Sequence, residues 1–343
     1  MRVIIKQAKS FLKYFRDYNM SEETNTTKVQ TDPVKPKKKF DYHNLIIWIL
    51  FVTVIWYMFI LSMPFDLLIF DEEAPFSGWY AGITYMHDPM VFTIMYYLST
   101  LPAFIGILIF TGVTKRNKFI FRSFLPGHAG NSIGKLLLGF LFGFLTNFSC
   151  VAAALIHGDI TLYFSFTAAQ IPFFLFAFLC VFIQSSSEEM WCRGFVYERV
   201  NVRYPLWVAI LVNSLFFAAL HIANPGATVL SIVSIAVCGL SYSIAKWYTG
   251  SIWFPMGLHT AWNFTQNFAF GLPNSGLVSA ESIFSLESAN ARSNLIYDPA
   301  FGVEGAIPAI LADTAIAVVC LALAAKDGRL KELRSRRDRR ETV

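Results

Sequence analysis

The stretch IPFFLFAFLCVFIQSSSEEMWCR, residues 171–193, decides the fold of this chain. Its first half is almost entirely apolar, and a helix of about 20 such residues spans the hydrocarbon of a bilayer. Only a helix or a closed barrel satisfies the backbone in lipid. The stretch then carries Glu188, Glu189 and Arg193, and ionisable groups at membrane depth persist mainly where they function. We therefore expect a transmembrane helix that contributes to a functional site.

The composition of the whole chain agrees with a membrane protein. Hydrophobic residues make up 55% of the 343 residues and charged residues only 15%, whereas a soluble domain has about 25% charged residues. The mean hydropathy is +0.50. Membrane lipids are therefore expected partners. We find no phosphate-binding glycine loop and no nucleic-acid-binding pattern, so we expect no nucleic acid partner.

Apolar runs that suit spanning helices occur at about eight places. Their helical form predicts an all-α fold, a polytopic transmembrane helical bundle. The fifth and seventh runs are the weakest, because they are short or are interrupted by Pro255 and Gly257. The eight runs are residues 44–63, 91–113, 136–156, 171–188 and beyond, 206–222, 228–247, 252–270 and 306–325.

Lys and Arg gather in every second connection between these runs, which places those connections and both termini in the cytosol under the positive-inside rule. We expect an integral, multi-pass protein of a bacterial cytoplasmic membrane. Residues 1–43 are predicted to form a partly disordered cytosolic tail, in which residues 1–17 are either an interfacial helix or a dispensable extension. The remaining divisions are N-terminal transmembrane helices at 44–170, a core at 171–270, an extracytosolic loop at 271–305, and a last helix with a basic tail at 306–343.

The two glutamates of the opening stretch have different surroundings in a helix. Glu189 and Arg193 are four residues apart and can form an ion pair on one face. Glu188 points about 100° away, so we expect it to have no partner in its own helix. A carboxylate removed from water suits a general base. The alternative is that both acids only mark a helix end at the cytosolic surface.

Two histidines lie in later apolar runs with a polar or aromatic residue four positions away. His221 follows Phe217, and a turn near Tyr204 would bring His221 level with Glu188 on a neighbouring helix. His259 precedes Asn263, and an imidazole and a carboxamide on one face can donate hydrogen bonds to a single oxygen, as an oxyanion hole requires. The alternative for His221 is an interfacial residue near a helix end. The alternative for His259 and Asn263 is interhelical hydrogen bonding.

Three further features have structural explanations. Asp313 lies in the last apolar run, where we expect it to form a hydrogen bond with a neighbouring helix rather than to line a cavity. Gly139 and Gly143 predict close helix packing. The five cysteines lack metal-type spacing and are expected to be small buried side chains without disulfides.

The three motifs together resemble the CPBP family of intramembrane proteases, which comprises CAAX proteases and bacteriocin-processing enzymes and includes the Abi proteins. They are Glu-Glu-x-x-x-Arg at 188–193, Phe-x-x-x-His at 217–221 and His-x-x-x-Asn at 259–263, and the resemblance covers about residues 171–270. It implies that Glu188 and His221 activate water, that His259 and Asn263 stabilise an oxyanion, and that Glu189, Arg193 and Phe217 support them. The implied substrate is a membrane-associated or lipidated peptide or a membrane protein.

The resemblance leaves the cofactor and the activity open. Members of this family are often described as metalloproteases, and Glu188, His221 and His259 could offer a ligand set to zinc. The chain has no His-Glu-x-x-His motif, and we favour direct activation of water by glutamate and histidine. Two alternatives to a protease are a proton-coupled transporter and a non-enzymatic bacteriocin-immunity or scaffold protein.

Overall fold

A computed structural model describes residues 89–335 of the chain. All described residues belong to one unit of the chain. The predicted N-terminal tail at 1–43 and the first predicted span at 44–63 lie outside the described residues, as do the last residues of the basic tail.

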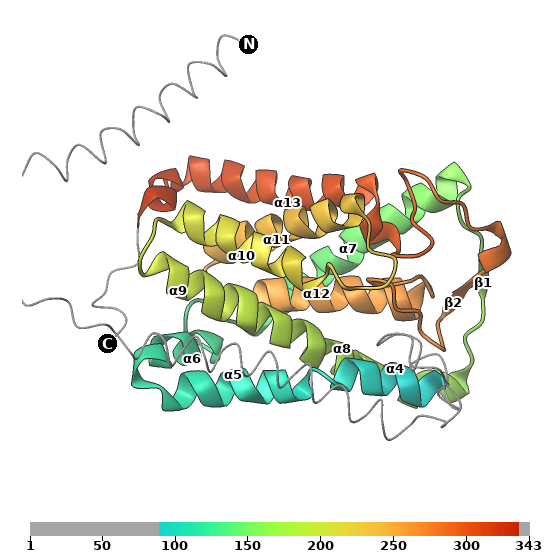
Figure 1. Cartoon of the computed structure of the whole chain (residues 1–343), viewed down its shortest axis with the longest axis horizontal. Coiled ribbons are helices and arrows are strands. Elements are labelled where there is room, and N and C mark those ends of the chain that lie inside the picture. Colours follow the sequence, from blue (N-terminus) through green and yellow to red (C-terminus); the bar gives the residue numbers. More distant parts are fainter. Residues whose placement is uncertain (1–88, 336–343) are drawn as a thin grey trace, which may run out of the picture. The chain divides into compact units, whose positions relative to one another are not determined.

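The described part is mostly helical, which confirms the predicted fold class (Figure 1). The α-helices are α4 (Pro89–Leu98), α5 (Leu101–Val113), α6 (Lys118–Phe124), α7 (Ile133–His157), α8 (Ile171–Glu189), α9 (Tyr197–Asn201), α10 (Leu206–Leu220), α11 (Val229–Thr249), α12 (Trp253–Phe264) and α13 (Ile307–Lys326). Two π-helical segments are η4 (Met190–Val196) and η5 (Thr265–Ala269). Short 3-10 turns are η2 (Lys115–Asn117), η3 (Ala168–Gln170), η6 (Ser288–Asn290), η7 (Val303–Gly305) and η8 (Leu330–Arg334).

Five helices among the described residues are long and apolar enough to cross a membrane. They are Thr93–Val113, Ile133–His157, Ala168–Asn201, Val229–Thr249 and Ile307–Lys326. The predicted runs at 206–222 and 252–270 do not reach that length and hydropathy: the first is the shorter apolar helix α10, and the second is α12 with η5. Almost every residue of α12 is buried, because α7, α8 and α11 pack around it and shield it. The total of eight spans and the orientation of the termini stay predictions.

Glycines bring α7 and α12 into close contact, as the sequence predicts. A Cβ atom on Gly143 would lie 2.1 Å from the backbone oxygen of Leu258, and one on Gly257 would lie 2.3 Å from that of Leu136. Both distances are far below van der Waals contact, so a larger residue would push the helices apart. This packing fixes the position of α12, which carries His259.

The helix that contains Glu188 continues well beyond the predicted run. Residues Ala168–Asn201 form one helix of 34 residues, in which the π-helical segment η4 starts directly after Glu189. A second π-helical segment, η5, follows α12 directly. π-Helical turns widen the hydrogen-bonding pattern and occur frequently at functional sites. The helices that carry Glu188 and His259 thus change their winding next to these polar residues.

The predicted loop at 271–305 contains ordered structure that returns to the helices. Strands β1 (Leu162–Phe164) and β2 (Phe284–Leu286) pair antiparallel, with Tyr163 opposite Ser285. The side chain of Asn267 in η5 donates hydrogen bonds to the backbone oxygens of Leu272 and Leu277, at 3.1 and 2.9 Å. These contacts hold the start of the loop against the helices, where it lines the central pocket.

Candidate active site

The ion pair between Glu189 and Arg193 is present as the sequence predicts. Arg193 Nη1 lies 2.9 Å from Glu189 Oε1, and both side chains are completely buried. The guanidinium also lies over the ring of Phe217, 4.1 Å from its centroid, and near that of Tyr242 at 5.4 Å. A buried charge needs such a partner to remain ionised, so this pair is a compensated structural unit behind the pocket.

Glu189 also orients His259 across the helix interface. His259 Nδ1 lies 3.0 Å from Glu189 Oε1, and its other ring nitrogen, Nε2, lies 3.9 Å from Glu188 Oε2. The rings of Phe217 and Tyr242 flank the imidazole at 5.9 and 5.8 Å between centroids. The ring is therefore fixed with Nδ1 facing Glu189 and Nε2 facing Glu188.

Glu188 is more accessible than Glu189, with a side chain that is 24% exposed. The expectation that it has no partner in its own helix is wrong. Gln184, one helical turn earlier, donates from Nε2 to Glu188 Oε1 at 2.5 Å, because side chains four residues apart meet on a helix. Glu188 Oε2 has no hydrogen-bond partner among the described residues. One carboxylate oxygen is thus held and the other is free to contact a ligand.

His221 caps the end of α10, where its ring packs on Phe217 with 4.7 Å between centroids. Its Nδ1 lies 2.8 Å from the backbone oxygen of Phe217. A carbonyl oxygen only accepts, so Nδ1 carries the proton and Nε2 of the neutral ring is an acceptor. This tautomer suits a group that receives a proton from water.

Asn263 is on the same face of α12 as His259, but its amide is engaged with α8. Asn263 Nδ2 lies 3.1 Å from Gln184 Oε1 and 3.4 Å from Ser185 Oγ. The predicted convergence of His259 and Asn263 on one oxygen would require Asn263 to exchange these contacts for the ligand, and it stays a prediction.

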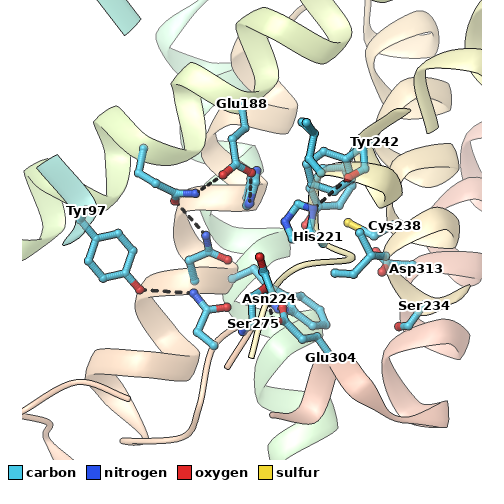
Figure 2. Close-up of a pocket in the computed structure, with 18 of the residues that line it drawn as sticks. Tyr97, Glu188, His221, Asn224, Ser234, Cys238, Tyr242, Ser275, Glu304 and Asp313 are labelled. Atoms are coloured by element: carbon cyan, nitrogen blue, oxygen red, sulfur yellow. Dashed lines mark hydrogen bonds and ion pairs between the residues drawn. The ribbon is translucent and has the colours of Figure 1, made fainter. Parts of the chain in front are cut away.

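The four predicted catalytic residues and Phe217 line one pocket with a cavity volume of about 120 Å³ (Figure 2). A single water requires roughly 10–15 Å³ of such space, so the pocket holds several waters or part of a peptide. Helices α4, α8, α10, α11, α12 and α13 and the loop before α13 all contribute to its wall. The predicted residues are Glu188, His221, His259 and Asn263.

The sequence reasoning missed several residues that line the pocket. Gln184 had a signal, since it lies one helical turn before Glu188. Asp313 was expected to form an interhelical hydrogen bond, but it lines the pocket and its Oδ1 has no hydrogen-bond partner among the described residues. Glu304 had no signal, because the fold of the loop brings it there. Other residues without a predicted role are Tyr96, Tyr97, Leu220, Asn224, Ser234, Ile235, Cys238, Tyr242, Trp262, Asn274 and Ser275.

Glu304 is a buried carboxyl that receives three hydrogen bonds. Ser275 donates to Oε1 from its backbone nitrogen and from Oγ, the latter at 2.7 Å, and Trp262 Nε1 donates to Oε2 at 3.2 Å. Burial raises the pKa of Glu304 from 4.5 to about 7, and these donors oppose that shift. Glu304 therefore changes its charge near neutral pH.

Zinc ligation by Glu188, His221 and His259 stays a prediction. Among residues 89–335, no group of three or more His, Cys, Asp or Glu side chains is placed to hold a metal ion. Nδ1 of His221 is engaged with the Phe217 carbonyl oxygen and Nδ1 of His259 with Glu189. The mechanism proposed below uses protein side chains and water.

The helices and the polar pocket define an integral membrane protein with an ionisable site among its helices. Residues 168–265 match the family model described as type II CAAX prenyl endopeptidase Rce1-like. This segment is thus similar to CAAX-type proteases and contains all three motifs, which confirms the family resemblance. The match supports a membrane endopeptidase without fixing its catalytic type. No curated protein matched the chain.

Proposed function

We propose that the protein is an intramembrane endopeptidase that hydrolyses a peptide bond in a membrane-associated or lipidated peptide or protein. The observation that carries the proposal is the free oxygen of Glu188, which lies 3.9 Å from His259 Nε2 in a pocket shared with His221 and Asn263. The family match of residues 168–265 supports the reaction class.

Glu188 and His221 are placed to activate water. Gln184 holds Glu188 Oε1, so Oε2 can take a proton from a water molecule in the pocket. His221 Nε2 is an acceptor that can hold the second hydrogen of the same water. The hydroxide oxygen then attacks the carbonyl carbon of the substrate, and Glu188 returns the proton to the departing amine.

His259 and Asn263 supply the donors for the tetrahedral oxyanion. Glu189, which pairs with Arg193, accepts a hydrogen bond from His259 Nδ1, so that nitrogen carries a proton. Nε2 of His259 can donate a hydrogen bond only when both ring nitrogens carry a proton. The ring is then a cationic imidazolium, which Glu189 stabilises. Asn263 joins by releasing Gln184 and turning its amide to the oxyanion.

The test compares Glu188→Gln with the unmodified protein in detergent micelles. The substrate is a pool of peptides, prepared by cleaving bacterial membrane proteins on the C-terminal side of glutamate residues. Mass spectrometry identifies the new termini that the protein produces. Loss of a general base lowers the rate about 10²–10⁴-fold. The matched control is Glu287→Gln, the same change at an exposed position outside the pocket. Equal cleavage by Glu188→Gln and Glu287→Gln would falsify the proposal and favour a transporter or scaffold.

A further inference from the structure

The pocket contains more carboxyl groups than the proposed reaction uses. Three carboxyl groups line it, from Glu188, Glu304 and Asp313, and no Lys or Arg among the described residues does. Figure 2 shows Glu188 and Glu304 at opposite ends of the pocket view, with His221 between them. Glu188 serves the proposed hydrolysis. Glu304 and Asp313 have no part in it.

Asp313 is the group that most needs a partner. It lies on α13, its side chain is only 3% exposed, and its Oδ1 has no hydrogen-bond partner among the described residues. Burying a carboxyl group without a partner is costly. Asp313 also lines the pocket, where a ligand can supply that partner.

Glu304 is held beside the same cavity by a rigid set of donors. Ser275 and Trp262 donate to its two oxygens, and the side chain is 6% exposed. These contacts fix the carboxyl group at the pocket wall without neutralising it by a cation. A preorganised acceptor of this kind loses little freedom when a ligand binds.

We propose that Asp313 and Glu304 form a subsite that binds a cationic side chain of the substrate, a lysine or an arginine. The inference rests on the proposed peptidase function and names a feature of its substrate. An ammonium or guanidinium group only donates hydrogen bonds, which matches two carboxyl groups that accept them. Both residues lie beyond the matched segment 168–265, so the C-terminal part of this chain would set the preference.

The experiment profiles cleavage sites in the peptide pool described above, which retains internal lysines and arginines. Purified protein is compared with Asp313→Asn and Glu304→Gln, and lysine or arginine frequency near the cut bond is counted. A charge-assisted hydrogen bond is worth about ten- to a hundredfold in binding. We expect the unmodified protein to prefer basic peptides by about that factor, and each variant to lose most of the preference while it still cleaves neutral peptides.

Asp327→Asn is the matched control, because it makes the same change at an exposed position just past the end of the same helix. It should keep the preference. Thermal unfolding of each variant confirms that the fold is retained. A second arm acetylates all amines, after which the preference should persist for arginine and vanish for lysine. Complete loss of cleavage in that arm would show that a free amino terminus is recognised, and would overturn the subsite.

The result separates this inference from the proposed function. If the unmodified protein cleaves and Glu188→Gln does not, but basic residues are not enriched or Asp313→Asn keeps the enrichment, the subsite is wrong and the peptidase stands. If no variant and no control cleaves any peptide, the peptidase proposal itself fails, and the subsite fails with it.

Discussion

Two groups of buried charges in this protein differ in how they are compensated. In the first, each acid has a cation: Glu189 pairs with Arg193 at 2.9 Å, and Glu198 pairs with Lys246 at 2.6 Å. Lys246 Nζ also donates to the backbone oxygen of Arg193 at 2.7 Å and lies 3.9 Å from the ring centroid of Tyr197. These contacts tie the long helix that contains α8, η4 and α9 to α11.

In the second group, which lines the pocket, no acid has a Lys or Arg beside it among the residues that form the wall. Glu188 Oε2 and Asp313 Oδ1 lack hydrogen-bond partners among residues 89–335, and Glu304 is held only by neutral donors. Unpaired buried carboxyl groups are destabilising. The difference separates two kinds of buried ionisable residue. Ion pairs between helices stabilise the fold, whereas carboxyl groups without a Lys or Arg partner can bind a ligand.

Removing a cation from the paired group should have the largest effect on stability. Lys246→Met leaves Glu198 buried without its cation, at a cost of about 3–5 kcal/mol in the free energy of unfolding. The double variant Glu198→Leu/Lys246→Met removes both charges and should recover most of that loss. Denaturant titration in micelles measures both. If the double variant is as unstable as Lys246→Met, the loss of stability does not come from the unpaired charge of Glu198.

Of the paired group, the sequence predicted Glu189–Arg193 but not Glu198–Lys246. Residues four apart in an apolar helix point to the Glu189–Arg193 pair, and the spacing of the three motifs brought Glu188, His221 and His259 to one pocket. Apolar length predicted the helical membrane fold. These features depend on helix geometry, which is local and regular.

The carboxyl groups of the pocket (Glu188, Glu304 and Asp313) form the uncompensated group. Of these, Asp313 and Glu304 were not predictable in the same way. Asp313 lies on α13, which follows Glu188 only after α10, α11 and α12, and the return of the 271–305 loop places Glu304 beside the pocket. Hydropathy also could not show that α12 is shielded by protein, since a helix surrounded by other helices can be apolar without spanning lipid. Such facts depend on tertiary packing.

The uncompensated group should make the stability of the protein depend on pH. The folded-state pKa of Glu304 is about 7, above its usual 4.5, so the folded protein binds more protons than the unfolded chain between these values. Stability should therefore fall as pH rises from about 4.5 to 7, by about 3 kcal/mol in total. The field of His259 opposes the upward shift of the Glu304 pKa.

Glu304→Gln cannot ionise, so its stability should change less across that interval. Thermal unfolding of both proteins at pH 5 and pH 8 measures the difference, and Glu287→Gln, an exposed site, serves as the control. Parallel pH curves for the unmodified protein and Glu304→Gln would place Glu304 with the compensated charges.

The smallest expected effect concerns Gln184, which links the free carboxylate to the oxyanion donor. Its Nε2 donates to Glu188 Oε1 at 2.5 Å, and its Oε1 accepts from Asn263 Nδ2 at 3.1 Å. Gln184→Leu should leave both groups free to rotate. We expect kcat to fall about tenfold, equivalent to about 1.4 kcal/mol, with little change in KM because the substrate still binds.

The control for Gln184→Leu is Gln170→Leu, the same change before the first turn of the helix and outside the pocket. Gln170 caps the helix start and contacts Glu281, so its loss should lower stability and leave kcat unchanged. If Gln184→Leu lowers stability alone, Gln184 belongs with the residues that complete the fold. If kcat falls at unchanged KM, a neutral side chain positions the carboxylate of Glu188.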